Sequence, residues 1–185
     1  MVKIRPYQEK DKQDVRFTCL NSEGPSQDGE RIDNFVLNTY CDYYLEKESH
    51  NCFVAVDEND KAIGYVICAE NYDKYYRTFL KEYVPRFKIF DIDLRIRAIF
   101  SSIPQMKHKA EYPAHLHIDV LPEYQRQGVG HQLVDALCAH LKAKGVKGVM
   151  LTTGTDNVKG RGFYKKYGFD EIEIYKSDAV YGLKL

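Results

Sequence analysis

The sequence has no tryptophan, no excess of either charge and no long apolar run. Its 27 acidic and 27 basic residues balance, so no global field favours nucleic acid or a charged membrane surface. No apolar stretch approaches the roughly 20 residues of a membrane span. The opening residues, MVKIRPYQEKDKQD, lack the apolar core of a signal peptide. We therefore expect a soluble cytoplasmic protein with neither a nucleic-acid nor a membrane partner.

Cysteine is present but forms no C-x-x-C pair. The odd count of five argues against a disulfide framework. Free cysteines are commonly small core residues in a reducing compartment, and we expect that role here. The length of 185 residues predicts one domain, spanning 1–185.

The most informative stretch is Ala114–Gly130, AHLHIDVLPEYQRQGVG, which predicts a strand, a glycine-containing loop and the start of a helix. Alternation places Leu116, Ile118 and Val120 on one face of the strand and His115, His117 and Asp119 on the other. The first amides of a helix lack intrahelical partners, and glycine lets an anion approach the backbone closely. This stretch therefore predicts a site for a diphosphate ligand.

The rest of the chain alternates helical and β-rich patterns. Helices are predicted near 11–20, over 31–45, from 129 to Gly145, and from a cap at Asp156 or Asn157 to Tyr167. Turn-forming residues predict a loop at 21–30. Strands are predicted at 2–6, 52–56, 62–69, 114–121, 146–152, 169–175 and 180–185. These elements predict a mixed α/β domain of about seven strands.

The segment at about 71–113 is too long for a plain connection and is rich in aromatic and basic residues. We interpret it as an insertion between the third and fourth strands, with a helix near 72–83, a break at Pro85 and a second helical or irregular piece to about Ser102. It is either additional core or a lid over a binding site. One hypothesis places Tyr75, Tyr76 and Phe79 in an acceptor pocket.

Two spaced motifs together resemble those of the GNAT superfamily of acetyl-CoA-dependent N-acetyltransferases. Gln125-x-x-Gly128-x-Gly130 resembles the Arg/Gln-x-x-Gly-x-Gly/Ala signature. The segment 157–169, NVKGRGFYKKYGF, resembles the family's Asn-x-x-Ala-x-x-Phe-Tyr-x-Lys-x-Gly-Phe, with Gly160 where alanine is usual. The stretch 112–121 further resembles a bacterial subgroup related to the acetyltransferase-like domain of O-GlcNAcases. The resemblance implies a GNAT fold, a mixed and mostly antiparallel sheet of about seven strands with helices on both faces.

The resemblance also implies a site for acetyl-CoA. It assigns the pyrophosphate to the loop amides, the pantetheine arm to backbone groups on a strand splayed from its neighbour by a β-bulge, and a position beside the cofactor to Asn157. It makes Tyr164 the acid that protonates the leaving thiolate. The implied cofactor-binding residues are Ile118, Val120, Gln125, Arg126, Gln127, Gly128, Val129, Gly130, His131, Asn157 and Tyr164.

The general base is not fixed by the resemblance. Many family members carry an ionisable residue nine or eleven positions before the first loop residue, but these positions are Leu116 and Ala114 here. Asp119 and His117 lie on the opposite face, about 6.5–7 Å apart along a strand. Both are candidates for substrate binding or proton transfer.

Two other readings remain open from the sequence. His115, His117 and Asp119 could hold a divalent metal if neighbouring strands supplied further ligands, although no such ligand spacing is evident. The fold could also serve as a non-catalytic acyl-CoA sensor or scaffold. Our prediction is an enzyme without a metal, which transfers acetyl to a small-molecule or peptide amine by direct attack in a ternary complex. Edge strands of this fold often pair between subunits, so a homodimer is possible.

Overall fold

The computed structural model describes residues 2–25 and 29–185, which form one twisted seven-stranded sheet with the order β1-β2-β3-β4-β5-β7-β6. All neighbouring strands are antiparallel except β4 and β5, which are parallel. The predicted mixed, mostly antiparallel sheet is therefore confirmed. The strands are β1 (Lys3–Pro6), β2 (Phe53–Val56), β3 (Ala62–Ala69), β4 (Ala114–Val120), β5 (Gly148–Gly154), β6 (Asp170–Ile174) and β7 (Asp178–Lys184).

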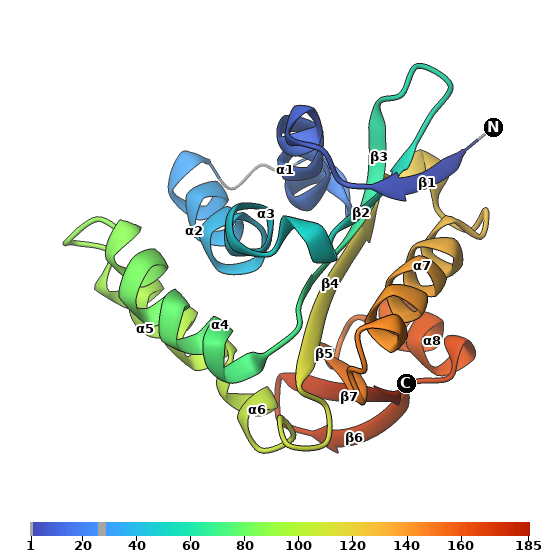
Figure 1. Ribbon diagram of the computed structural model, residues 1–185. Helices are drawn as coiled ribbons and strands as arrows, with labels where there is room; N and C mark the ends of the chain where they lie inside the picture. The colour runs from blue at the N-terminus through green and yellow to red at the C-terminus, as the bar shows by residue number, and fades with distance from the viewer. Residues whose placement is uncertain (1, 26–28) are drawn as a thin grey trace.

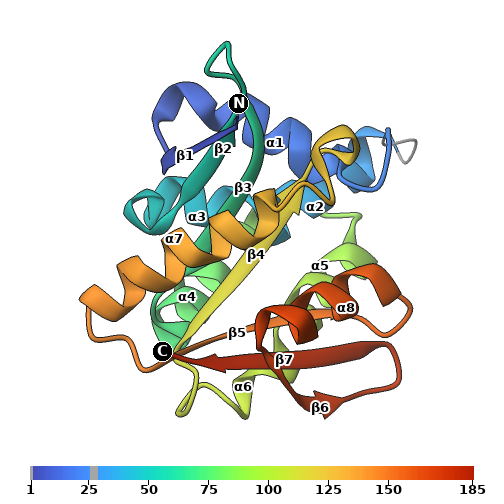
Figure 2. The same ribbon diagram turned by 90° about the vertical axis from the view of Figure 1, so that its right-hand side faces the viewer.

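Helices cover both faces of the sheet, as Figures 1 and 2 show. One face packs against α1 to α5 and the other against α7, and successive β3 residues alternate between the two cores: Tyr65 and Ile67 face one, Val66 and Cys68 the other. The α-helices are α1 (Lys12–Asn21), α2 (Glu30–Tyr40), α3 (Asp42–Lys47), α4 (Tyr72–Thr78), α5 (Ile92–Ser101), α6 (Ile103–Met106), α7 (Val129–Ala143) and α8 (Val158–Tyr167). Shorter helical turns are η1 (Glu9–Asp11), η2 (Ser49–Asn51), η3 (Phe79–Tyr83, a π-helix), η4 (Val84–Arg86) and η5 (Pro122–Tyr124).

The parallel strands β4 and β5 pair only at their beginnings. Their register consists of Ala114↔Val149 and His115↔Met150, after which β5 continues beside β7 while β4 continues beside β3. The expected separation of the two parallel strands, β4 and β5, is present. The pairing of β4 with β3 keeps one register throughout, so the expected β-bulge does not occur between these two strands. The backbone groups along one edge of the second half of β4 therefore have no strand partner and can pair with another extended chain.

One helical prediction needs correction. The single helix expected over 31–45 is divided into α2 and α3 at Cys41, whose φ of −131° is not helical. The predicted turn at 145 is correct, because Gly145 adopts φ +74° after α7. Residues 26–28 of the loop expected at 21–30 lie outside the described residues.

The segment between β3 and β4 is mostly helical and contributes to the core. Its helix α4 continues into the π-helix η3, and η4 contains the predicted break at Pro85. Tyr72, Tyr75 and Phe79 are almost completely buried.

The cysteines are all free, and four of the five are buried. No helix in the described chain has both the length and the apolarity needed to cross a bilayer.

Candidate active site

The Gln125–Gly130 loop joins η5 to α7 through a left-handed turn. Arg126 and Gly128 have φ values of 59° and 81°. No atom lies within 4 Å of the position that a Cβ on Gly128 would occupy. The helix begins at Val129, so its first-turn amides face this open space without intrahelical partners. The donors and the open cradle fit a phosphate group.

The first loop residue anchors the loop to its surroundings. The Gln125 side-chain amide donates to the carbonyl oxygens of Val120 and Ser22, both at 2.9 Å. The loop is thereby fixed to the end of β4 and to the residue after α1. At Gly130, a Cβ would come within 3.2 Å of the Phe163 ring, so a small residue is needed where α7 meets α8. These contacts explain the spacing of the first motif.

The second motif begins with a helix cap. Asn157 accepts a hydrogen bond from the backbone amide of Gly160 at 2.8 Å and donates to the Thr153 hydroxyl at 3.2 Å. A Cβ at Gly160 would stand 2.7 Å from the Asn157 side-chain nitrogen, which explains the glycine where alanine is usual. Asn157 therefore fixes the start of α8 on the end of β5.

Tyr164 lies on α8 among aromatic side chains. Its ring centroid is 5.8 Å from that of Phe169 and 5.6 Å from that of Tyr181. Burial raises the pKa of the Tyr164 phenol above its usual value, and the charge of Asp119 raises it further. The phenol therefore keeps its proton at neutral pH and can donate it.

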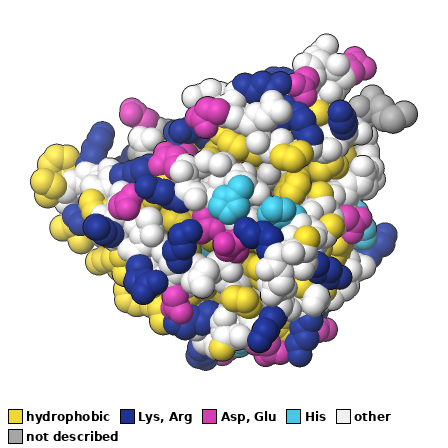
Figure 3. Space-filling view, viewed as in Figure 1, with side chains coloured by type: hydrophobic (Ala, Val, Ile, Leu, Met, Phe, Trp, Pro, Cys, Tyr) yellow, Lys and Arg dark blue, Asp and Glu magenta, His cyan; other side chains and the backbone are white. Residues whose placement is uncertain are grey.

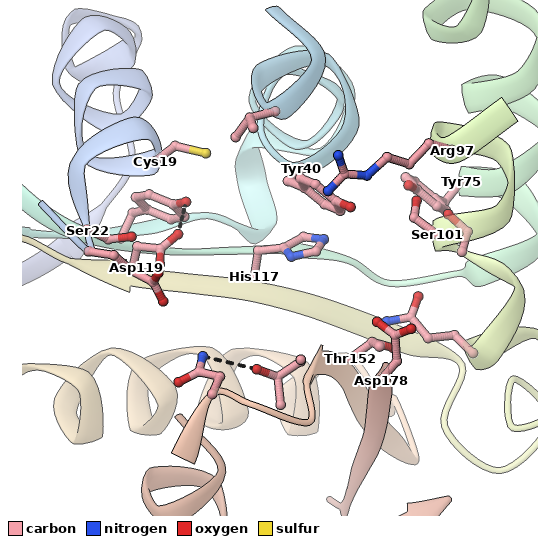
Figure 4. Close-up of a pocket in the computed structure, with 18 residues that line it drawn as sticks. Cys19, Ser22, Tyr40, Tyr75, Arg97, Ser101, His117, Asp119, Thr152 and Asp178 are labelled. Atoms are coloured by element: carbon pink, nitrogen blue, oxygen red, sulfur yellow. Dashed lines mark hydrogen bonds between the residues drawn. The ribbon is translucent and has the colours of Figure 1, made fainter. Parts of the chain in front are cut away.

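Asp119 is half-buried and points into a cavity (Figure 4). Its carboxylate accepts a hydrogen bond from the Tyr65 hydroxyl. Burial raises the pKa of Asp119 to about 6, although hydrogen bonds from Tyr65 and Ser22 oppose the shift. A carboxylate with this pKa is mostly ionised at neutral pH and is well placed to act as a base.

His117 lines the same cavity two residues earlier on β4. Its Nε2 lies 3.0 Å from the Tyr44 hydroxyl, which also lies 2.7 Å from Nε2 of the buried His115. Burial lowers the pKa of His117 to about 4, so its imidazole is neutral at physiological pH. The Tyr40 ring packs against His117 with centroids 5.5 Å apart.

The three polar β4 side chains do not converge on one point. Both imidazoles turn to Tyr44, with ring centroids 6.2 Å apart, while Asp119 bonds to Tyr65. The potential metal ligands that do converge in the described chain are Glu48, His50 and Glu70, where the Lys144 ammonium already bonds Glu70. This arrangement gives the metal reading of the β4 row no support.

The cavity has a volume of about 520 Å³ and extends from the splay of β4 and β5 to the helices on one face of the sheet. It brings together three predicted site residues: His117, Asp119 and Asn157. It also contains polar groups that the sequence did not identify, from the residues after α1 and from α5, α6 and β7. These additional residues include Ser22, Glu23, Arg97, Ser101, Gln105 and Asp178.

Of the three aromatic residues of α4 and η3 expected in an acceptor pocket, only Tyr75 is among the described residues that line the cavity. Phe79 is fully buried and stacks on Tyr75 with centroids 5.5 Å apart, while Tyr76 stacks on Tyr72 at 6.0 Å. Phe79 therefore supports the cavity wall from behind.

Comparison with known proteins agrees with this geometry. Residues 17–169 match the model of the acetyltransferase (GNAT) family. A crystal structure of SsHAT has a TM-score of 0.86 at 26% identity, with 99% of this chain and 98% of that chain covered. The PaiA N-acetyltransferase of Thermoplasma acidophilum, solved with coenzyme A, gives a TM-score of 0.63 at 17% identity over 100% and 99% of the chains. A polyamine N-acetyltransferase of Drosophila melanogaster gives 0.68 at 14% identity over 100% of both chains.

The last two likenesses show the fold, whereas the family match covers most of the chain and both motifs. The fold, the phosphate loop and the cavity agree with that match. This chain therefore belongs to the acetyltransferase (GNAT) family and is an acetyltransferase that uses acetyl-CoA.

Proposed function

We propose that this single domain transfers the acetyl group of acetyl-CoA directly to a primary amine within a ternary complex. The observation that carries the proposal is the position of Asp119: an ionisable carboxylate in the cavity, close enough to Tyr164 for its charge to raise the phenol's pKa. In this proposal Asp119 is the base and Tyr164 is the acid.

Acetyl-CoA supplies the acetyl group as a thioester. We assign its pyrophosphate to the amides of the Gln125–Gly130 loop, including those of Gln127 and Val129, and to His131. The backbone of Ile118 and Val120, at the β4 edge that β5 leaves, receives the pantetheine arm and polarises the thioester carbonyl. Asn157 lies beside the cofactor, and Arg126 is close to its phosphates.

The lining of the cavity favours a cationic acceptor. Glu23, Asp119 and Asp178 contribute carboxylates against the single guanidinium of Arg97. An amine arrives mostly protonated at neutral pH. Asp119 takes that proton, and the neutral nitrogen forms its bond to the acetyl carbon as the carbon–sulfur bond breaks. Tyr164 donates a proton to the departing sulfur, and the second proton of the nitrogen passes through water to restore the Tyr164 phenol. His117 is neutral and orients the acceptor by hydrogen bonding.

The finer assignments rest on the same residues. The 112–121 stretch supports membership of the bacterial subgroup resembling the acetyltransferase-like domain of O-GlcNAcases. The free cysteines favour a cytoplasmic location, since reducing compartments keep thiols unpaired. The acceptor is a small molecule or a peptide amine, and the 71–113 insertion provides one wall of its cavity.

An amine panel tests this proposal. Thiol release from acetyl-CoA should depend on the amine, and reciprocal plots at varied concentrations of both substrates should intersect. Cationic amines should be preferred over neutral isosteres. Parallel lines would indicate an acyl-enzyme, and acetyl-CoA binding with no turnover on any amine would favour a sensor.

A further inference from the structure

The helix α5 exposes a row of large apolar side chains. Within the helix these are Ile92, Ile96 and Phe100, with exposed fractions of 60%, 51% and 61%. The row continues through Ile89 and Phe90 before the helix (79% and 84%) and Ile103 after it (40%). We name these six side chains the α5 stripe. Figure 3 shows apolar side chains gathered along the left edge of the molecule, where Figure 1 places α5.

The stripe is a second apolar face on a helix that is already docked. Leu94 and Ala98 on the opposite side of α5 are buried in the core. Arg31 of α2 holds the start of α5 through ion pairs with Asp91 at 2.8 Å and Asp93 at 2.6 Å. A helix that is apolar on both sides is normally buried on both sides. The outer face therefore lacks a partner within the described chain.

The size of the stripe is that of a protein interface. Complete exposure of a large side chain amounts to roughly 150–200 Å², so the six exposed fractions correspond to roughly 550–750 Å² of apolar surface. The largest apolar patch on a typical monomer is about 300–600 Å². A standard interface buries about 800 Å² on each partner, of which about 60% is apolar. The stripe alone supplies that apolar share.

The order of the side chains is symmetric about Ile96. Steps of three, four, four and three residues connect large aliphatic or aromatic groups in the order Ile89, Ile92, Ile96, Phe100 and Ile103. In an antiparallel pair centred on Ile96, Ile92 meets Phe100, Ile89 meets Ile103, and Ile96 meets its own copy. A two-fold interface requires such self-complementarity, because the same patch faces itself.

We propose that the α5 stripe is the interface of a two-fold symmetric homodimer, in which the two α5 helices pack antiparallel around Ile96. This interface differs from the edge-strand pairing that the fold often uses, in which an edge strand, β1 or β6, would be the contact. The helix also supplies Arg97 and Ser101 to the cavity. Dimerisation therefore fixes one wall of the acceptor site in each subunit.

Light scattering coupled to size exclusion tests the interface directly. The wild type should elute at twice the chain mass of 21.5 kDa, and Ile96→Glu should elute at the chain mass with an unchanged circular dichroism spectrum. Ile96 is half-exposed, so glutamate there is tolerated in the monomer. Two matched controls carry the same change at isolated exposed apolar residues: Phe17→Glu on α1 (52% exposed) and Ile174→Glu on β6 (57%). Both should remain dimeric.

Cross-linking provides a second measurement. Ile96→Cys should form an intermolecular disulfide on mild oxidation, whereas Phe17→Cys should not. A wild type that is monomeric up to about 100 μM would overturn the proposal. A dimer that Ile174→Glu dissociates and Ile96→Glu spares would transfer the interface to the sheet edge. A monomer that binds phosphatidylcholine–phosphatidylserine vesicles through Ile96 would instead make the stripe a membrane contact.

Discussion

Asp119 and His117 share one face of β4 but have opposite ionisation behaviour. Burial is the main cause in both cases, because it disfavours the charged form: the pKa of the acid rises to about 6 and that of the imidazole falls to about 4. At neutral pH the carboxylate is therefore mostly ionised and the imidazole is neutral. Of these two side chains, only Asp119 changes charge just below physiological pH.

The first prediction concerns the pH dependence of activity. Because the base must be ionised, kcat/KM should rise with pH through about 6 and then level off. Asp119→Asn should lower kcat/KM by about 10²–10⁴-fold. His117→Gln should weaken acceptor binding and keep the rise of kcat/KM near pH 6. Loss of this rise of kcat/KM in His117→Gln would instead assign the proton transfer to the imidazole.

The second prediction is that ionisation of the Asp119 carboxyl lowers the free energy of unfolding. A carboxyl whose pKa is higher in the folded state binds its proton more tightly there, so the free energy of unfolding falls as pH rises from about 4 to 6. Asp119→Asn removes this loss and can still accept the Tyr65 hydrogen bond. At pH 8 the variant should be more stable by on the order of 1–2 kcal/mol, discounted for partial exposure. Urea unfolding at pH 4 and pH 8 measures the difference, which should nearly vanish at pH 4.

Tyr164 gives the third prediction. Phenylalanine keeps the ring contacts with Phe169 and Tyr181 but has no proton to donate, so kcat should fall by about 10²-fold or more. Tyr167→Phe is the matched control on the same helix. Its hydroxyl already donates to Asp135 at 2.6 Å. Equal losses in the two variants would exclude a specific role for the Tyr164 hydroxyl.

At the scale of elements, the phosphate loop and α7 give a fourth prediction. Gly128→Asp introduces negative charge and a side chain where the loop has φ 81°, so acetyl-CoA should no longer raise the melting temperature. Gly145→Asp places the same residue at φ 74° just after the other end of the helix, where the fold offers no phosphate site. It should lower stability by a similar amount and keep the ligand-induced shift. Loss of that shift in both variants would mean that backbone strain, rather than the loop site, is responsible.

Elements with a strong local pattern were predictable from the sequence. Alternation identified β4, and Gly145 and Gly168 marked helix ends because their positive φ suits glycine. The break between α2 and α3 was missed, since Cys41 carries no helix-breaking signal and its backbone is set by packing. The β-bulge expected from the resemblance was likewise replaced by a simple divergence of β4 and β5.

At the scale of the whole molecule, a buried network joins α3, β3 and α7. The Glu48 carboxylate accepts from the Tyr43 hydroxyl and the Asn51 amide, both at 3.0 Å, and from the Glu70 backbone amide at 3.2 Å. Asn51 in turn accepts from Lys144 of the α7 end at 3.0 Å. Segments distant in the sequence are thus connected through one buried acid.

The fifth prediction is that Glu48→Ala lowers the free energy of unfolding by about 2–4 kcal/mol, because several buried donors lose their acceptor. Glu82→Ala removes an exposed ion pair with Lys47 and should leave the free energy of unfolding almost unchanged. Denaturant titration of both variants measures these changes. A loss in Glu48→Ala no larger than in Glu82→Ala would show that the network is not stabilising.

The site as a whole was only partly predictable. Its cofactor side comes from two continuous motifs, which a sequence displays directly. Its proposed acceptor side combines Glu23, Arg97 and Asp178 from distant segments, and only the folded chain brings them to one cavity. Arg97 in particular lies in the 71–113 segment, whose local pattern indicates a helix and says nothing of where its polar side faces.

Isothermal titration with acetyl-CoA of the wild type and of Tyr164→Phe tests the proposed division of roles most directly. We predict that both bind with the same micromolar dissociation constant while only the wild type turns over efficiently, which would make Tyr164 a chemical residue at a preformed cofactor site. Failure of the wild type to bind acetyl-CoA would contradict the account, and loss of binding in Tyr164→Phe would reduce this tyrosine to a structural contact.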